Sequence, residues 1–373
     1  MPSRNNARAR ASKPVRQLLL VVGAGVVVAA VAQPAAAAGW SIQRVPTPAH
    51  SNETGLNAVS CASTRDCVAV GFQDLSVTND PVPLVEHWDG STWSTEQTST
   101  PGMPAWSGWL SAVSCPSARV CIAVGVEYGA DSRPRPLVAW RDGSTWSVER
   151  ISLGGAEALD GVSCVSSADC MAVGYGRSSV AAHWNGARWR AQNIGFGDPA
   201  GRPNALTGVS CTADGCAAVG WDNVGLCGRG EDDFYDLPVL GFWTEQVWSV
   251  RRHPNLVCAN RRGAAGHLLN GVSCTSQVAC TAVGDGVYRW DGRRWSIQPT
   301  PVAADPLDAV SCTSTDACTA VGSGIYAWNG RRWRSAQIPF AGELTGVSCP
   351  SRASCVAVGS YIDSDRLLVA SEG

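Results

Sequence analysis

Short apolar runs recur along this chain at close spacing, and turn-forming residues separate them. In the segment Leu269–Thr300 the apolar and small residues form four such runs, at 269–274, 280–284, 286–290 and 294–298. Between the last two runs, Asp291-Gly292 is a strong hairpin signal, because glycine accepts a positive φ at no steric cost. Pro299 and Pro301 then end the pairing, since proline lacks the amide donor. The segment predicts four short antiparallel strands, an all-β meander.

The same unit occurs seven times, marked each time by Val-Ser-Cys, four or five further residues, and Cys-x-Ala-Val-Gly. The first cysteines of successive copies are 54, 49, 47, 63, 38 and 37 residues apart. One meander cannot bury both of its faces, so the units must stack on each other. These spacings suit propeller blades with loops of variable length, and they fit a β-solenoid or a three-fold trefoil less well. We expect a seven-bladed β-propeller of four-stranded antiparallel blades.

The side-chain sizes within each unit agree with stacked blades. The first two strands are built from small residues, and the last two carry pairs of tryptophans, which can fill the wedge where blades splay apart. A row of rings could instead form a sugar-binding stripe, but core packing is favoured at these positions. The pairs are Trp88/Trp93, Trp140/Trp146, Trp184/Trp189, Trp243/Trp248, Trp290/Trp295 and Trp328/Trp333.

The two ends of the repeat region complement each other. The seventh unit lacks a fourth strand, because Leu367–Gly373 matches only a third strand. The segment Gly39–Gln43 reads Gly-Trp-Ser-Ile-Gln and matches the fourth strand Arg294–Gln298, Arg-Trp-Ser-Ile-Gln. We therefore predict that the N-terminal strand completes the last blade, which removes open sheet edges.

The first 38 residues have the three parts of a secretory signal. A basic start without acids precedes the fifteen-residue apolar run Leu18–Ala32, and Ala36-Ala37-Ala38 then offers a small-residue cleavage site. The alternative is a membrane anchor, for which the run is short. We expect residues 1–38 to be a signal peptide and residues 39–373 to be a single propeller domain. The mature chain should then be soluble, and secreted to the extracellular space or the cell wall.

Cysteine usage agrees with an exported protein. An even number of cysteines in such a chain predicts disulfides. Zinc is the alternative for paired cysteines, but the phrase carries no recurring histidine. Two cysteines outside the phrase should lie in two loops of the fourth blade and bond to each other. The expected bonds are Cys61–Cys67, Cys115–Cys121, Cys164–Cys170, Cys211–Cys216, Cys227–Cys258, Cys274–Cys280, Cys312–Cys318 and Cys349–Cys355.

Charge narrows the range of partners. The segment 1–38 holds five of the 29 basic residues and no acid, which leaves 24 basic and 31 acidic side chains and a net charge of −7. A mildly acidic domain is a poor match for nucleic acid. We expect no metal and no other cofactor, and a monomer. Arginine in place of lysine, with abundant Ala, Gly and Val, indicates a GC-rich bacterial genome.

One face of the predicted ring should carry the binding site. The loops between second and third strands and the connections between blades share a face, and they are the segments whose lengths vary; variable loops on a rigid scaffold are where binding sites usually lie. Stacking rings and hydrogen-bonding groups there would suit a glycan or a surface protein, although these loops could also pack only on themselves. The candidate ligand-binding residues, which we expect to lie in these loops, are Trp106, Trp109, Trp221, Asp232, Phe234, Tyr235, Arg252 and His253.

The sequence is compatible with three functional hypotheses. A non-catalytic binding propeller for a cell-wall glycan or a surface partner is favoured. The alternative is a glycan-degrading enzyme, with candidates Glu231, Asp232 and Asp233 beside His253, because two separated carboxylates are the usual requirement. Clustered oxygens there could also hold Ca²⁺. A purely structural surface protein is the third. We assign no catalytic residue, and we expect His87 and His183 to be satisfied structural residues.

The repeats resemble a known superfamily. The seven-fold phrase, the split last blade and hairpins such as Trp88–Trp93 and Trp328–Trp333 are similar to the β-propellers built of WD40-, Kelch- and tectonin-type repeats. The resemblance covers nearly all of Gly39–Gly373. The hairpins depart from the sialidase Asp-box, which has one residue between Asp and Gly, and they lack the Gly-His and Trp-Asp endings of WD40 blades. The resemblance implies the fold, and no single function follows from it.

Overall fold

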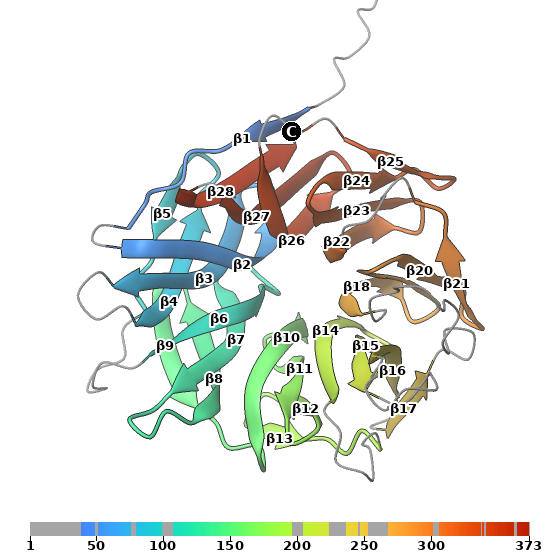
Figure 1. Ribbon diagram of the computed structural model, residues 1–373, viewed down its shortest axis with the longest axis horizontal. Helices are drawn as coiled ribbons and strands as arrows, with labels where there is room; N and C mark the ends of the chain where they lie inside the picture. Colours follow the sequence, from blue (N-terminus) through green and yellow to red (C-terminus); the bar gives the residue numbers. More distant parts are fainter. Residues whose placement is uncertain are drawn as a thin grey trace, which may run out of the picture. The chain divides into compact units, whose positions relative to one another are not determined.

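The structure, a computed structural model, describes residues 39–48, 51–75, 80–98, 107–195, 204–223, 236–244, 247–252, 268–300, 306–336, 338, 341–361 and 364–372. Seven four-stranded antiparallel sheets, all within the unit Ala38–Gly373, are arranged as the blades of a ring (Figure 1). The predicted seven-bladed β-propeller is confirmed. In each blade four consecutive strands pair in order from the axis outward, except in the last blade.

The first four blades follow one another along the chain. Blade one is β2 (Ser51–Ser63), β3 (Asp66–Leu75), β4 (Pro81–Trp88) and β5 (Trp93–Thr95). Blade two is β6 (Ser107–Ser114), β7 (Val120–Tyr128), β8 (Pro134–Asp142) and β9 (Thr145–Arg150). Blade three is β10 (Ala156–Ser166), β11 (Asp169–Gly176), β12 (Ser179–Trp184) and β13 (Trp189–Ala191). Blade four is β14 (Asn204–Thr212), β15 (Gly215–Asn223), β16 (Asp236–Thr244) and β17 (Val247–Arg252).

The remaining three blades complete the ring. Blade five is β18 (Leu269–Ser276), β19 (Ala279–Gly284), β20 (Val287–Trp290) and β21 (Trp295–Gln298), which matches the four predicted runs closely. Blade six is β22 (Leu307–Ser314), β23 (Ala317–Gly322), β24 (Ile325–Trp328) and β25 (Trp333–Ser335). Blade seven is β26 (Gly342–Ser351), β27 (Ser354–Tyr361), β28 (Ser364–Glu372) and, from the other end of the chain, β1 (Trp40–Ile42).

The ring is closed by the N-terminal strand, as predicted. Trp40 lies opposite Glu372 and Ile42 opposite Ala370 in the β1–β28 pair, which lies at the outer edge of the ring (Figure 1). The amide of Gln43 adds a hydrogen bond of 2.8 Å to the carbonyl oxygen of Val369. Trp40 is 7% exposed, so the strand contributes core as well as pairing.

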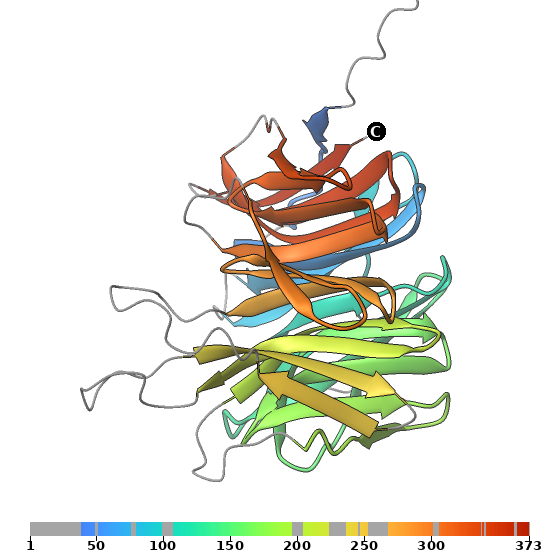
Figure 2. The ribbon, with the colours of Figure 1, turned by 90° about the vertical axis from the view of Figure 1, so that its right-hand side faces the viewer.

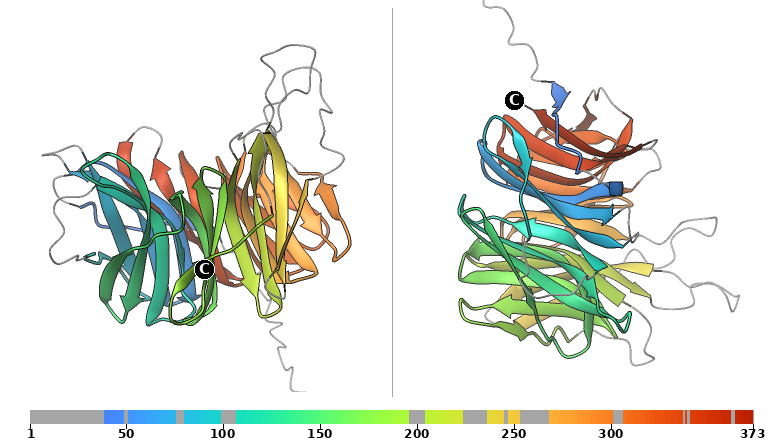
Figure 3. Two further views of the ribbon diagram at one scale, coloured as in Figure 1. Left: turned by 90° about the horizontal axis from the view of Figure 1, so that it is seen from below. Right: turned by 90° about the vertical axis from the view of Figure 1, so that its left-hand side faces the viewer.

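The strands run between two faces of the ring, which Figures 2 and 3 show edge-on. One face, here called the hairpin face, carries the turn between first and second strands, such as the one after Ser63, and the hairpin between third and fourth strands. The opposite face, here called the loop face, is where β2 begins at Ser51 and β3 ends at Leu75. Because neighbouring strands are antiparallel, every blade repeats this arrangement.

Seven disulfides lie next to the hairpin face. Each one joins the first strand of a blade to the second, as Cys61–Cys67 does in blade one, with Cα atoms 3.9–4.1 Å apart. The predicted pairing within the repeated phrase is confirmed for all seven. Cys227 and Cys258 lie outside the described residues, so their bond stays a prediction.

The serine of each Val-Ser-Cys phrase joins two blades. Its hydroxyl oxygen accepts a hydrogen bond from the amide of the cysteine in the next blade, at 2.9–3.0 Å in all seven places. The bond from the amide of Cys61 to Ser348 connects blade one to blade seven, so the set of bonds forms a closed circle. Both residues of the phrase therefore have a structural role: the cysteine forms a disulfide within its blade, and the serine binds its blade to the next one.

The glycine that ends each Cys-x-Ala-Val-Gly phrase lies opposite a β-bulge in the inner strand, where the two backbones approach closely. Every inner strand shifts register by one residue two positions before its Val-Ser-Cys, as between Leu206 and Gly208 in blade four. The bulge brings a backbone carbonyl against the second strand. A Cβ atom at Gly220 would overlap the carbonyl oxygen of Ala205, so only glycine fits there.

The outer tryptophans pack between blades rather than forming an exposed stripe. The second ring of the pair is buried at Trp93, Trp146, Trp248 and Trp333, with exposures of 1–7%. Four same-blade pairs lie 5.6–5.8 Å apart between ring centroids. The expectation of core packing is confirmed for these rings.

Blade two departs from the predicted Trp140/Trp146 pair. Its hairpin contains one additional residue, so Arg141 faces Trp146 across the strands while Trp140 faces Ser147. Trp140 consequently points to the other side of the sheet and packs on Trp184 of blade three, at 4.6 Å between centroids.

Arg141 instead binds a carboxylate between blades one and two. Its guanidinium, 3% exposed, donates to both oxygens of Glu96 at 2.7 and 2.9 Å, and the indole of Trp146 donates to the same carboxylate at 2.7 Å. His87 lies between Glu96, at 3.5 Å, and Asp66, at 3.3 Å. His183 likewise contacts Asp169 at 2.8 Å. Both histidines therefore have carboxylate partners, as expected for structural residues.

Candidate binding surfaces on the loop face and along the axis

The structure places three of the sequence-predicted site residues on strands. Trp109 is in β6, Trp221 is in β15, and Arg252 is the last residue of β17. The expectation that both tryptophans lie in loops was wrong, because strands β6 and β15 extend further toward the loop face than the repeat pattern indicated. Trp106, Asp232, Phe234, Tyr235 and His253, with Glu231 and Asp233, lie outside the described residues, so their roles stay predictions.

Trp109 lines a cavity of about 420 Å³ on the loop face, between blades one and two. We call it the rim pocket. It combines aromatic and apolar side chains with carboxylates, and its volume lies within the roughly 300–1,000 Å³ of ligand pockets. The lining residues are Glu53, Asn57, Phe72, Asp74, Pro81 and Trp109. Trp221, two blades away from Trp109, does not line it.

Local packing fixes the two rings of the rim pocket. Phe72 lies against Gly55 of the neighbouring strand, where a Cβ atom would come within 2.7 Å of the ring. Trp109 contacts Tyr128 across blade two, with ring centroids 5.8 Å apart and planes inclined at 43°. Both rings remain partly exposed. They therefore present aromatic surface to a ligand without having to reorganise.

Asn57, one of the residues that line the rim pocket, connects its two blades. Its side-chain amide donates a hydrogen bond of 2.8 Å to the carbonyl oxygen of Leu110, the residue after Trp109. The same asparagine also lines a second cavity, which lies on the axis of the ring. The rim pocket thus lies beside the loop-face entrance to the axial cavity.

The axial cavity has a volume of about 170 Å³ and is lined by all seven inner strands. Each strand contributes the residue in its bulge, namely Asn57, Ser111, Asp160, Thr207, Asn270, Asp308 and Thr345. Four of these side chains donate hydrogen bonds of 2.6–3.1 Å to a carbonyl oxygen of the next blade. The residues that line the cavity therefore also join neighbouring blades to each other.

Two of the bulge residues are acids. Burial raises the pKa of Asp160 to about 6. Burial, together with the nearby Glu343 carboxylate, raises the pKa of Asp308 to about 6 as well. Both occupy the position from which Thr207 and Thr345 donate to the next blade. Only a protonated carboxyl group could donate in the same way.

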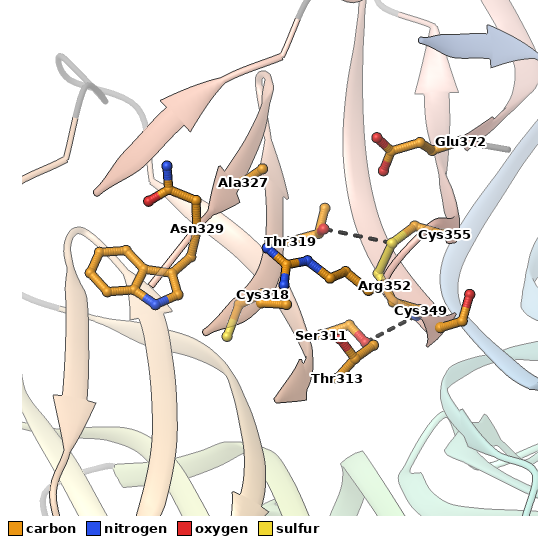
Figure 4. A pocket seen from close by; sticks show the side chains of 13 residues that line it. Ser311, Thr313, Cys318, Thr319, Ala327, Asn329, Cys349, Arg352, Cys355 and Glu372 are labelled. Carbon is orange, nitrogen blue, oxygen red and sulfur yellow. Dashed lines mark hydrogen bonds between the residues drawn. A yellow bond between two sulfur atoms is a disulfide. The ribbon is translucent and has the colours of Figure 1, made fainter. Parts of the chain in front are cut away.

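A third cavity, of about 180 Å³, lies on the hairpin face between blades six and seven. It exists because Glu372 faces Cys355 where Trp328 faces the equivalent cysteine in blade six. Figure 4 shows the Arg352 side chain extending across this cavity, with Glu372 apart from it on the blade-seven side. Burial raises the pKa of Glu372.

Comparison with solved structures shows the fold alone. YCF48 from Cyanidioschyzon merolae is 13% identical, with a TM-score of 0.56, over 90% of this chain and 99% of that one. A structure of YCF48 bound to D1 peptide is 10% identical, TM-score 0.57, over 90% and 96%. The WD40 repeats of RRP9 are 13% identical, TM-score 0.57, over 90% and 98%. The chain is a seven-bladed propeller with WD40-like structural neighbours. No protein-family model and no curated protein matches it.

The sequence pointed to Trp109 but not to its partners in the rim pocket. Glu53, Phe72, Asp74 and Pro81 belong to β2, β3 and β4, and all four lie outside the repeated phrase, which in blade one spans Val59–Gly71. They meet Trp109 because blade one packs on blade two, which is a relation that no local pattern contains. Among the described residues no cluster of three metal-ligating side chains occurs, and no helix there is long and apolar enough to cross a membrane.

Proposed function

We propose that this protein is an exported, non-catalytic interaction propeller that binds a polypeptide partner through its loop face. The observation that carries the proposal is the rim pocket, in which Trp109 and Phe72 stand beside the carboxylates of Glu53 and Asp74. Partly exposed rings held by packing, with polar groups at their edges, are the usual anchors of a protein interface.

The propeller neighbours add support of a weaker kind. One of them, YCF48, is described as bound to a peptide. At 10% identity this likeness concerns the scaffold, so it makes a peptide partner reasonable without identifying one. The glycan that the sequence also allows becomes an outcome of the test.

Export rests on two independent features. Seven disulfides close hairpins throughout the ring, and disulfides persist in oxidising compartments. Residues 1–38 have the charge and hydropathy pattern of a signal peptide. N-terminal sequencing of protein recovered outside the cell should give a start at Gly39; recovery of the uncleaved chain in membranes would replace the signal with an anchor.

The binding claim is tested by selecting random displayed peptides against the exported chain, with a glycan panel screened in parallel. The loop-face variant is Trp109→Ala/Trp221→Ala, and the matched hairpin-face variant is Arg352→Ala, an exposed site. Selected peptides should lose at least about tenfold in affinity for the loop-face variant, as for a central aromatic anchor, and none for Arg352→Ala. Loss only with Arg352→Ala, binding of glycans alone, or no binder at all would overturn the proposal.

A further inference from the structure

The rim pocket has charge and shape for a particular kind of group. We propose that it binds a cationic side chain, arginine or lysine, presented by the polypeptide partner. This inference rests on the proposed function and specifies which chemical group of the partner the loop face recognises. It follows from the two carboxylates of the pocket, from its aromatic walls and from the charge of the surrounding domain.

The charged groups of the rim pocket are the carboxylates of Glu53 and Asp74. In the part of the chain that the structure describes, neither makes a hydrogen bond or an ion pair. Two arginines at the loop-face end of blade two are engaged with other acids, because Arg135 donates to Asp131 at 2.7 Å and Arg150 to Glu127 at 2.6 Å. Both carboxylates are therefore available to pair with a cationic group of a ligand.

The apolar lining residues of the rim pocket are suited to the uncharged part of an arginine or lysine side chain. A guanidinium or ammonium group is attracted to the face of an indole or phenyl ring, and Trp109 and Phe72 both line the pocket. The methylene stem of arginine or lysine can pack on Pro81 and the rings while its charged end meets the carboxylates. The cavity of about 420 Å³ leaves room for the adjoining backbone of the partner.

The surrounding charge favours the same occupant. Without residues 1–38 the chain has 31 acidic and 24 basic side chains, a net charge of −7. This field attracts basic segments and accelerates their encounter with the loop face. A neutral sugar could stack on Trp109 but would leave two carboxylates without a counter-charge. The arrangement thus favours a basic peptide over a glycan.

The experiment follows Trp109 directly. The exported chain is labelled with 5-fluorotryptophan, and Trp109→Phe assigns its ¹⁹F resonance. N-acetylarginine amide and its neutral isostere N-acetylcitrulline amide are then titrated in the millimolar range. The Trp109 resonance should shift saturably with the arginine probe. The affinity of the protein for the citrulline probe, measured from the same resonance, should be at least about fivefold lower. The Trp221 resonance, outside the pocket, is the internal reference and should not move.

Two variants locate the charge. Glu53→Gln/Asp74→Asn should reduce affinity for the arginine probe to that for citrulline, whereas Glu149→Gln, an exposed acid outside the pocket, should leave it unchanged. Equal binding of the two probes, an unaffected carboxylate variant, or no shift of Trp109 would each overturn the inference. If selected peptides still need the loop face but carry no basic residues, only this inference fails and the proposed function stands.

Discussion

Replacing Trp40 with alanine tests how much the N-terminal strand contributes to ring closure. The ring of Trp40 is 7% exposed and belongs to the core cluster between blades six and seven, with Val321 and Leu344. Truncating a buried tryptophan costs about 3–5 kcal/mol in the free energy of unfolding, from lost burial and the cavity left behind. Ile42, on the same strand, is 43% exposed, so Ile42→Ala should cost at most about 0.5 kcal/mol.

Both variants keep the backbone pairing of β1 with β28, so their difference isolates the packed ring. Thermal melting under non-reducing conditions, followed by circular dichroism, should place Trp40→Ala at least about 5 °C below the wild type. Ile42→Ala should melt close to the wild type. Equal melting temperatures for the two variants would mean that the strand does not insert its tryptophan into blade seven, and the account of closure would be refuted.

Three further substitutions probe the blades themselves. Ser114→Ala leaves the partly buried amide of Cys164 without its acceptor and should cost about 1 kcal/mol in guanidinium unfolding, against no change for exposed Ser144→Ala. Gly220→Ala forces a Cβ atom onto a carbonyl oxygen and should abolish secretion of folded protein, whereas Gly286→Ala, with 3.5 Å of clearance, should be tolerated. Because the pKa of Asp160 is raised from 3.8 to about 6, the free energy of unfolding falls as pH rises through that window. Asp160→Asn should therefore stabilise the protein, by a margin of order 1–2 kcal/mol, in melts at about pH 7.5 but not at about pH 3.5.

The fold could be predicted because the information is local and repeated. Each Asp-Gly or Asn-Gly hairpin and each cysteine pair fixes strands within a single blade, and the seven cysteine pairs fix the blade count. What could not be predicted is the relation between blades. The serine of the phrase was visible in every copy, but its bond to the next blade depends on how two sheets stack. The offset of Trp140 depends on one additional hairpin residue, Arg141, whose partner Glu96 lies 45 positions away.

The candidate site was predictable only in part for the same reason. Trp109 stood out because it lies outside the regular tryptophan pattern, and the structure places it in a cavity. Glu53 and Asp74 belong to another blade and carry no sequence signal of their own. Their proposed role depends on the cavity that they share with Trp109, which only the three-dimensional arrangement reveals.

Seven blades form a closed ring in which the first strand completes the last blade. The most direct measurement is peptide mapping of the double variant Ser41→Cys/Ser371→Cys under non-reducing conditions, because Ser41 and Ser371 face each other in the β1–β28 pair. We predict a bond between positions 41 and 371, with all seven hairpin disulfides retained. New cysteines that stay unbonded, or that bond to hairpin cysteines, would contradict the closed ring.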